Sequence, residues 1–236
     1  MPVERLNAQR QPQTSTRMTM RCSGKLAARY AWILFAITGL LSGGWVQASD
    51  SKPRVLVHVD VETTGLTAGY HEMIDIGLAV TDEKGLIIDE RFIRIMPTFP
   101  ERLDPGAAAV NGFSVERWQS LGASSEAEAV RELIAFLAPL VKKHQLVFTA
   151  FNAWFDQQFV AALLAEHGHD FRSFFHYMVL DLPSMAWSLG SKGLTGDQLA
   201  RDFGLKAETK DPLQHTGESG VRFNVALYQA MIEAER

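Results

Sequence analysis

Residues 55–66 read VLVHVDVETTGL, an apolar run that ends in Asp60 and Glu62 with one residue between them. Side chains alternate along a strand, so both carboxylates project to the same face. Two anions side by side in a place of low dielectric are costly unless a cation joins them, and hard divalent metals prefer oxygen ligands. The alternative is a strand end that reaches water. Thr-Thr-Gly-Leu at 63–66 favours a site, because it adds hydroxyls, a flexible backbone and an apolar side chain.

Four further segments complete a pattern with this stretch. NAWFD at 152–156 follows the apolar run 146–150, and VNGFS at 110–114 is followed by Glu116. VLD stands at 179–181, and His215 precedes ALY at 226–228. In this order the segments resemble the motifs of the DEDDh-type 3′–5′ exonucleases, the family of the DNA polymerase III proofreading subunit, ribonuclease T and oligoribonuclease. Five matches in the right order over residues 54–230 are far more specific than any one of them.

The resemblance implies a ribonuclease-H-like fold, and the hydrophobic pattern agrees with it. Three antiparallel strands followed by alternating helices and buried strands predict an α/β protein with a mixed sheet flanked by helices. A loop is expected at 97–105. The expected strands are 55–61, 73–81, 86–96, 146–150 and 177–182, and the expected helices are 125–140, 153–166, 197–203 and about 218–234.

A catalytic set follows from the same resemblance. It implies two divalent ions, Mg²⁺ or Mn²⁺, with Asp60 as the ligand that bridges them. Glu62 would hold the ion that carries the attacking water, and Asp156 would hold the second ion. His215 would accept the proton of that water, because imidazole titrates near neutrality. Asp156 taken alone has another explanation, the stabilisation of a helix start.

One position departs from the family pattern. Counting from His215, the fourth carboxylate is expected at position 220, where this chain has glycine. Glu218 is the first candidate to replace it, provided that the helix starts later and that nearby glycines let the loop reshape. Asn224, one turn beyond Gly220, is neutral and therefore a poorer metal ligand. A degenerate site without a fourth ligand is the remaining alternative.

The resemblance also implies contacts to the end of a nucleic-acid strand. Thr63 and Thr64 would bind the 3′ hydroxyl and phosphate of the terminal nucleotide, and Leu66 would wedge against its base. Asn152 of the second motif is counted among the substrate contacts. Bases of any sequence can stack on aromatic rings, and three such rings lie near the second motif: Phe151, Trp154 and Phe155. For Phe155, packing in the core is an equally good explanation.

The predicted function is metal-dependent 3′–5′ exonuclease activity on single-stranded ends of DNA or RNA, with release of 5′-monophosphates and no nucleotide cofactor. The alternative is a catalytically degenerate module that keeps the fold and binds nucleic acid or a protein, and Gly220 motivates it. Members of the family are often dimers, so the resemblance implies a homodimer as one form.

The sequence pattern of residues 1–48 predicts that the protein is exported from the cytoplasm. Basic residues up to Arg29 precede the apolar run AWILFAITGLL at 31–41, and Val46-Gln47-Ala48 offers a cleavage site. The alternative is an uncleaved membrane anchor, since no charge lies between Arg29 and Asp50. In either case the exonuclease domain, expected at 55–236 after a linker at 49–54, would lie outside the cytoplasm: in the periplasm, secreted, or held at the membrane.

The net charge of that domain indicates which kind of nucleic-acid contact to expect. Residues 1–48 carry six basic residues and one acidic residue, which leaves 17 of 23 basic and 26 of 27 acidic residues and a formal charge of −9. A protein that grips long duplex DNA is expected to show a basic face, so brief contact with a strand end is favoured. Cys22, the single cysteine, lies in the first segment, so the domain needs no disulfide.

Overall fold

The computed structural model describes residues 52–235, which lie within one unit spanning Asp50–Arg236. The signal peptide or anchor predicted at 1–48, and the first part of the linker at 49–54, lie outside the described residues. Between residues 52 and 235, no helix is both long enough and apolar enough to cross a membrane.

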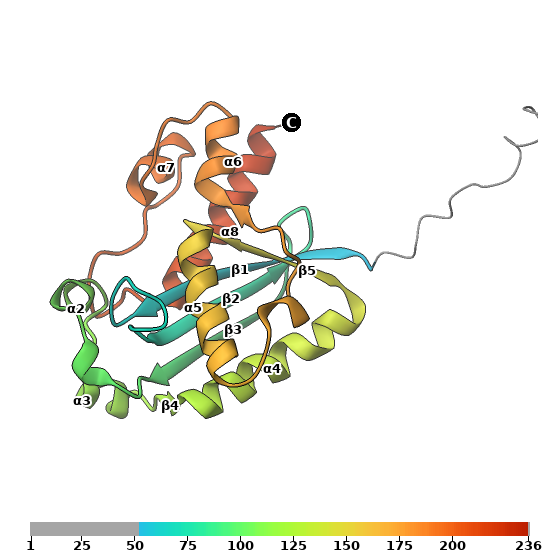
Figure 1. The fold of residues 1–236 in the computed structure, drawn as a ribbon. Coiled ribbons are helices and arrows are strands. Elements are labelled where there is room, and N and C mark those ends of the chain that lie inside the picture. Colours follow the sequence, from blue (N-terminus) through green and yellow to red (C-terminus); the bar gives the residue numbers. More distant parts are fainter. Residues whose placement is uncertain (1–51, 236) are drawn as a thin grey trace, which may run out of the picture. The chain divides into compact units, whose positions relative to one another are not determined.

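A six-stranded mixed sheet forms the centre of the described unit, as predicted (Figure 1). The strand order is β4-β3-β2-β1-β5-β6, and β1 pairs antiparallel with β2 and parallel with β5. The two outermost strands are only two residues long, so the strand expected at 177–182 is much shorter than predicted. The strands are β1 Arg54–Thr63, β2 Met73–Thr81, β3 Ile87–Met96, β4 Ser124–Ser125, β5 Gln145–Ala150 and β6 Leu180–Asp181.

The four predicted helices are present, and three short helices join them. The short ones, α2, α3 and α6, have six or seven residues, too few to show a hydrophobic period, and each begins at a capping Asp or Ser. Short 3₁₀ turns lie at Pro100–Arg102 and Phe171–Ser173. The helices are α2 Pro105–Asn111, α3 Val115–Ser120, α4 Glu126–Lys143, α5 Ala153–Glu166, α6 Leu182–Ser188, α7 Gly196–Asp202 and α8 Gly217–Ala234.

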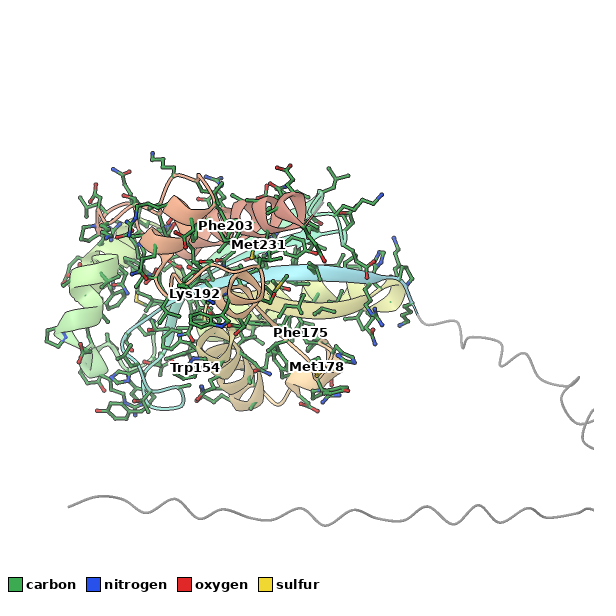
Figure 2. The ribbon with its side chains drawn as sticks, turned by 90° about the horizontal axis from the view of Figure 1, so that it is seen from above. Trp154, Phe175, Met178, Lys192, Phe203 and Met231 are labelled. Atoms are coloured by element: carbon green, nitrogen blue, oxygen red, sulfur yellow. The ribbon has the colours of Figure 1, made fainter. Side chains whose placement is uncertain are left out.

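The two faces of β1 serve two different cores, because its side chains alternate. Val55, Val57, Val59 and Val61 pack in the cluster covered by α4 and α5, whereas Leu56 packs with residues of α6, α7 and α8. Figure 1 shows α5 and α8 on opposite sides of the sheet. In Figure 2, Phe175 of the first cluster and Met231 of the second likewise lie on opposite sides of β1. Asp60 and Glu62 share the face of Leu56, toward α8.

Helix α8 approaches the sheet most closely at its first turn, where Gly217 lies against Gly77 of β2. A Cβ on Gly77 would lie under 3.0 Å from the carbonyl of Gly217, and a Cβ on Gly217 would lie under 3.0 Å from the backbone of Asp60 and Gly77. The Gly217 N–H donates a hydrogen bond of 2.9 Å to the buried carboxyl of Asp75. This contact between two glycines brings the start of α8 against β1, and His215 directly precedes that turn.

The close approach predicts that Gly77→Ala destabilises the protein. The new methyl group would meet backbone atoms that cannot rotate away, and overpacking of this kind costs roughly 1–3 kcal/mol. Gly196→Ala is the matched control, because the nearest atom to its Cβ, on Phe223, would be 3.7 Å away. We expect its free energy of unfolding to stay within about 0.5 kcal/mol of the parent. Denaturant unfolding compares the two, and equal stability would contradict the packing described.

Candidate active site

Three of the predicted acidic residues meet at the carboxyl end of β1. Asp60 and Glu62 come from the strand itself, and Asp156 comes from the first turn of α5. The Asp156 Oδ1 accepts a hydrogen bond of 3.0 Å from the Val61 N–H, which fixes the helix start to the strand. All three line one cavity of about 240 Å³ together with His215. The structure therefore brings the four predicted catalytic residues together.

The carboxylates are crowded enough to disturb their ionisation. Burial, followed by the charges of Asp156, Glu208 and Glu62, raises the pKa of Asp60 well above its ordinary value. Burial likewise raises the pKa of Asp156, although its hydrogen bond from Val61 opposes the shift. Each ionised form is unfavourable here because water is scarce and neighbouring anions repel it. The cavity thus has a marked preference for positive charge.

His215 is the cation that the described residues supply to this cluster. Its Nε2 lies 3.1 Å from Glu62 Oε1, and its Nδ1 lies 2.9 Å from the Thr209 carbonyl oxygen. The hydrogen bond to Glu62 is the main cause that raises the pKa of His215 to about 9. At neutral pH the imidazole is therefore protonated in this state. The residue predicted to be the general base is found as an ion-pair partner of Glu62.

The second oxygen of Glu62 is held by a residue that was not among the predicted site residues. Asn111, at the end of α2, donates from Nδ2 to Glu62 Oε2 at 3.3 Å and to the Thr63 carbonyl oxygen at 3.0 Å. Its own Oδ1 accepts from the Phe113 N–H at 3.1 Å. Asn111 belongs to the VNGFS segment that resembles the family motif, but the segment by itself does not indicate which residue its amide contacts.

Position 220 faces the site, as counting from His215 predicted. A Cβ on Gly220 would lie under 3.0 Å from both carboxyl oxygens of Asp60. Glu218 does not replace the missing acid, and that expectation is corrected. Helix α8 begins at Gly217, so residue 218 lies on another side of the helix from residue 220. There the Glu218 carboxylate is exposed and pairs with Arg222 at 2.8 Å.

A different carboxylate, Glu208, lies beside the cluster. It comes from the segment between α7 and α8, lines the same cavity as Asp60 and Asp156, and accepts a hydrogen bond of 2.6 Å from the Ser219 hydroxyl. Its Oε1 is 3.5 Å from His215 Nδ1. The sequence analysis missed Glu208, because a residue in an aperiodic connection has no pattern to identify it.

The predicted substrate contacts divide into two groups. Thr63 and Leu66 line the cavity, and the Leu66 side chain is 81% exposed at its rim. Thr64 is fully buried, and its hydroxyl accepts from the Glu72 N–H at 2.9 Å, so it holds the loop rather than a substrate. Asn152 adopts a left-handed backbone with φ of 62° at the start of α5, and its side chain does not line the cavity. The expectation for Thr64 is corrected on these grounds, and a substrate contact by Asn152 stays a prediction.

The aromatic residues of the second motif differ in the same way. Phe151 and Phe155 line the cavity that contains Asp60 and Asp156. Trp154 is 59% exposed and does not line that cavity; Figure 2 labels it beside α5. Phe155 also packs against the core, so one ring serves both the cavity wall and the packing beneath it.

The donors at this site fit a hard divalent cation in kind. They are carboxylate oxygens, which Mg²⁺ and Mn²⁺ prefer, and their mutual repulsion would be relieved by a cation. Within residues 52–235, however, no three His, Cys, Asp or Glu side chains are placed to ligate one ion. Asp60 is turned toward Gly220, and Glu62 is engaged by His215 and Asn111. Ion binding would therefore require these two side chains to turn.

The His215 ion pair predicts how stability depends on pH without metal. The pKa of His215 is about 9 in the folded protein and 6.5 in the unfolded chain. Its stabilising contribution is complete below 6.5 and is lost as the pH rises through about 9. The raised pKa of Asp60 acts in the same direction. Thermal unfolding in chelator should therefore show a melting temperature that falls between these two pH values.

His215→Gln tests the origin of that slope. The variant cannot carry the charge, so its melting temperature should fall less steeply over the same interval. A decline as steep as that of the parent would show that another group titrates there and that the pairing with Glu62 contributes little.

Comparison with known proteins gives a consistent result. The RNase_T model, described as an exonuclease family, matches residues 57–228. The 3′-5′ DNA exonuclease Cap18 of Escherichia coli is 31% identical over 108 residues, which cover 45% of this chain and 55% of that protein. The chain thus matches about half the length of this relative.

Solved structures share the fold. E. coli exonuclease I in complex with a dA16 oligonucleotide has a TM-score of 0.63 at 14% identity, over 77% of this chain and 41% of that one. The zinc-bound E. coli exonuclease I complex with single-stranded DNA has a TM-score of 0.61 at 14% identity, over 78% and 41%. Identity this low shows the fold alone. With the family model covering most of the domain, the chain belongs to the DEDDh-type 3′–5′ exonuclease family and has glycine in place of the fourth acid.

Proposed function

We propose that the protein is a metal-dependent 3′–5′ exonuclease that removes nucleotides one at a time from single-stranded ends and releases 5′-monophosphates. The observation that carries the proposal is the convergence of Asp60, Glu62, Asp156 and His215 on one cavity in a chain of the exonuclease family. Two divalent ions, Mg²⁺ or Mn²⁺, would be held by the three carboxylates. When bound, they would stabilise the charge on the phosphoryl oxygens and activate the attacking water.

The hydrogen bonds of His215 identify which nitrogen would exchange a proton. The Thr209 carbonyl can only accept, so Nδ1 keeps its hydrogen and Nε2 is the exchangeable site. Nε2 now faces Glu62, whose charge raises the pKa of the imidazole. A cation held by Glu62 would remove the hydrogen bond that is the main cause of the raised pKa of His215. In its neutral form, Nε2 would be the atom that could accept a proton from water.

The walls of the cavity suit the end of a single strand. Leu66 and Val110, exposed by 81% and 51%, line the cavity together with Phe155. These apolar groups would contact the terminal base without regard to its identity. The acidic floor would repel the phosphate of the same nucleotide, so substrate binding should itself require a divalent cation.

Degradation of a 5′-labelled single-stranded oligonucleotide tests the proposal. The purified protein should shorten it stepwise with Mg²⁺ or Mn²⁺ and stop with chelator. Asp60→Asn should lower the rate at least about 100-fold, since loss of groups that only support a metal ligand already costs about 10–100-fold. Glu218→Gln removes the same charge outside the cavity and should keep the parental rate. Undiminished activity of Asp60→Asn would contradict the assigned site, and a ribo-oligonucleotide of equal sequence compares RNA with DNA.

A nucleic-acid- or protein-binding module without catalysis is the second candidate. Two observations favour it. Position 220 carries no acid, and among residues 52–235 no three possible ligands are placed around one point. Oligonucleotide binding without Mn²⁺ binding at millimolar concentration would decide for this candidate.

We also propose that residues 1–48 direct export of the domain. The proposal rests only on the sequence: the basic segment, the apolar run and the Val46-Gln47-Ala48 motif. N-terminal sequencing of the protein from its native host should then begin near Ser49, and a full-length cytosolic chain would exclude export.

A further inference from the structure

We propose that Glu208 supplies the fourth carboxylate of the metal site, from the segment that precedes His215 rather than from helix α8. The inference rests on the proposed function, because it names a ligand of the same site. It accounts for Gly220: the helix position that should carry an acid is empty, and another acid reaches the same cavity.

The position of Glu208 is the first argument. It lines the cavity of about 240 Å³ that Asp60, Glu62 and Asp156 also line. It also lines a second cavity of about 390 Å³, together with Asp60 and His215. Its Oε1 is held at 2.6 Å by the Ser219 hydroxyl. No hydrogen bond from any residue between 52 and 235 reaches its Oε2, so one oxygen is anchored and the other is free to ligate.

The competing role, orientation of His215, is already filled by another group. His215 Nδ1 lies 2.9 Å from the Thr209 carbonyl oxygen but 3.5 Å from Glu208 Oε1. The shorter contact is a normal hydrogen bond and the longer one is at the limit of such bonds. The backbone carbonyl therefore fixes the tautomer of His215, and Glu208 is not required for it.

An unpartnered buried group gives independent support for a ligand at this place. Asn224 is 1% exposed and donates from Nδ2 to the Val59 carbonyl oxygen at 2.9 Å. Its Oδ1 is buried with no hydrogen-bond partner among the described residues, and the residue lines the larger cavity together with Asp60 and Glu208. A buried acceptor left unpaired is costly, so it indicates a cation or the water bound to one.

The segment that carries Glu208 is held in place at several points. Arg117 donates to the Leu213 carbonyl oxygen at 2.9 Å and to the Asn111 carbonyl oxygen at 2.9 Å, so it joins this segment to the end of α2. Lys210, two residues after Glu208, pairs with Asp197 of α7. The residues that follow Glu208 are thus tied to α2 and α7, which helps to preorganise its carboxylate as a metal ligand.

Titration calorimetry with Mn²⁺ tests the inference on the purified parent, Glu208→Gln and Glu218→Gln. Glu208→Gln should weaken Mn²⁺ binding at least about tenfold, whereas Glu218→Gln, which removes an exposed carboxylate only ten residues away, should bind as the parent does. Without metal, the melting temperature of Glu208→Gln should not fall, because the amide keeps the contact to Ser219 and removes one of four neighbouring negative charges.

The outcomes separate the two claims. If Glu208→Gln binds Mn²⁺ as tightly as Glu218→Gln, the inference is overturned while the metal-dependent function stands. If the parent itself binds no Mn²⁺, the proposed function fails and the inference fails with it. Should the glutamine variant not fold, Glu208→Ala is judged by the same binding measurement and the same tenfold criterion.

Discussion

Repulsion among buried carboxylates at the end of β1 is the constraint on which the rest of the site depends. Asp60, Glu62 and Asp156 are forced together by the strand and by the helix that begins beside it. Two of the three are partly compensated by local donors: Val61 N–H for Asp156, and His215 and Asn111 for Glu62. These donors make the metal-free state tolerable but do not neutralise the cluster. A divalent cation would complete that compensation, which links folding, metal binding and catalysis in one place.

The fold delivers the remaining residues through one close contact. Because Gly77 and Gly217 carry no side chains, the first turn of α8 rests directly on the sheet, and Gly220 meets the carboxyl of Asp60. The segment before the turn supplies His215 and Glu208, which line the cavity together with Asp60 and Glu62 of β1. Arg117 holds this segment by hydrogen bonds to the carbonyl oxygens of Pro212 and Leu213. A loop that would otherwise vary is thereby made part of the site.

Sequence reasoning reached the parts of this arrangement that regular structure controls. The alternation along β1 predicted that Asp60 and Glu62 share a face, and counting from His215 correctly placed residue 220 toward the site. It failed where contacts distant in the sequence decide the outcome. The hydroxyl of Thr64 accepts a hydrogen bond from the Glu72 N–H, and the carboxylate of Glu208 accepts one from the Ser219 hydroxyl. The sequence could have predicted that Glu218 pairs with Arg222, because Arg222 lies four residues later on the same helix face.

Anomalous diffraction from crystals grown with Mn²⁺ tests the central claim most directly, because it locates the ion independently of any activity. The account predicts a manganese peak in the cavity between β1 and the segment before α8, with oxygens of Asp60, Glu62 and Glu208 as ligands and His215 released from Glu62. A cavity without a manganese peak, or a peak whose ligands exclude Glu208 while His215 stays paired with Glu62, would contradict it.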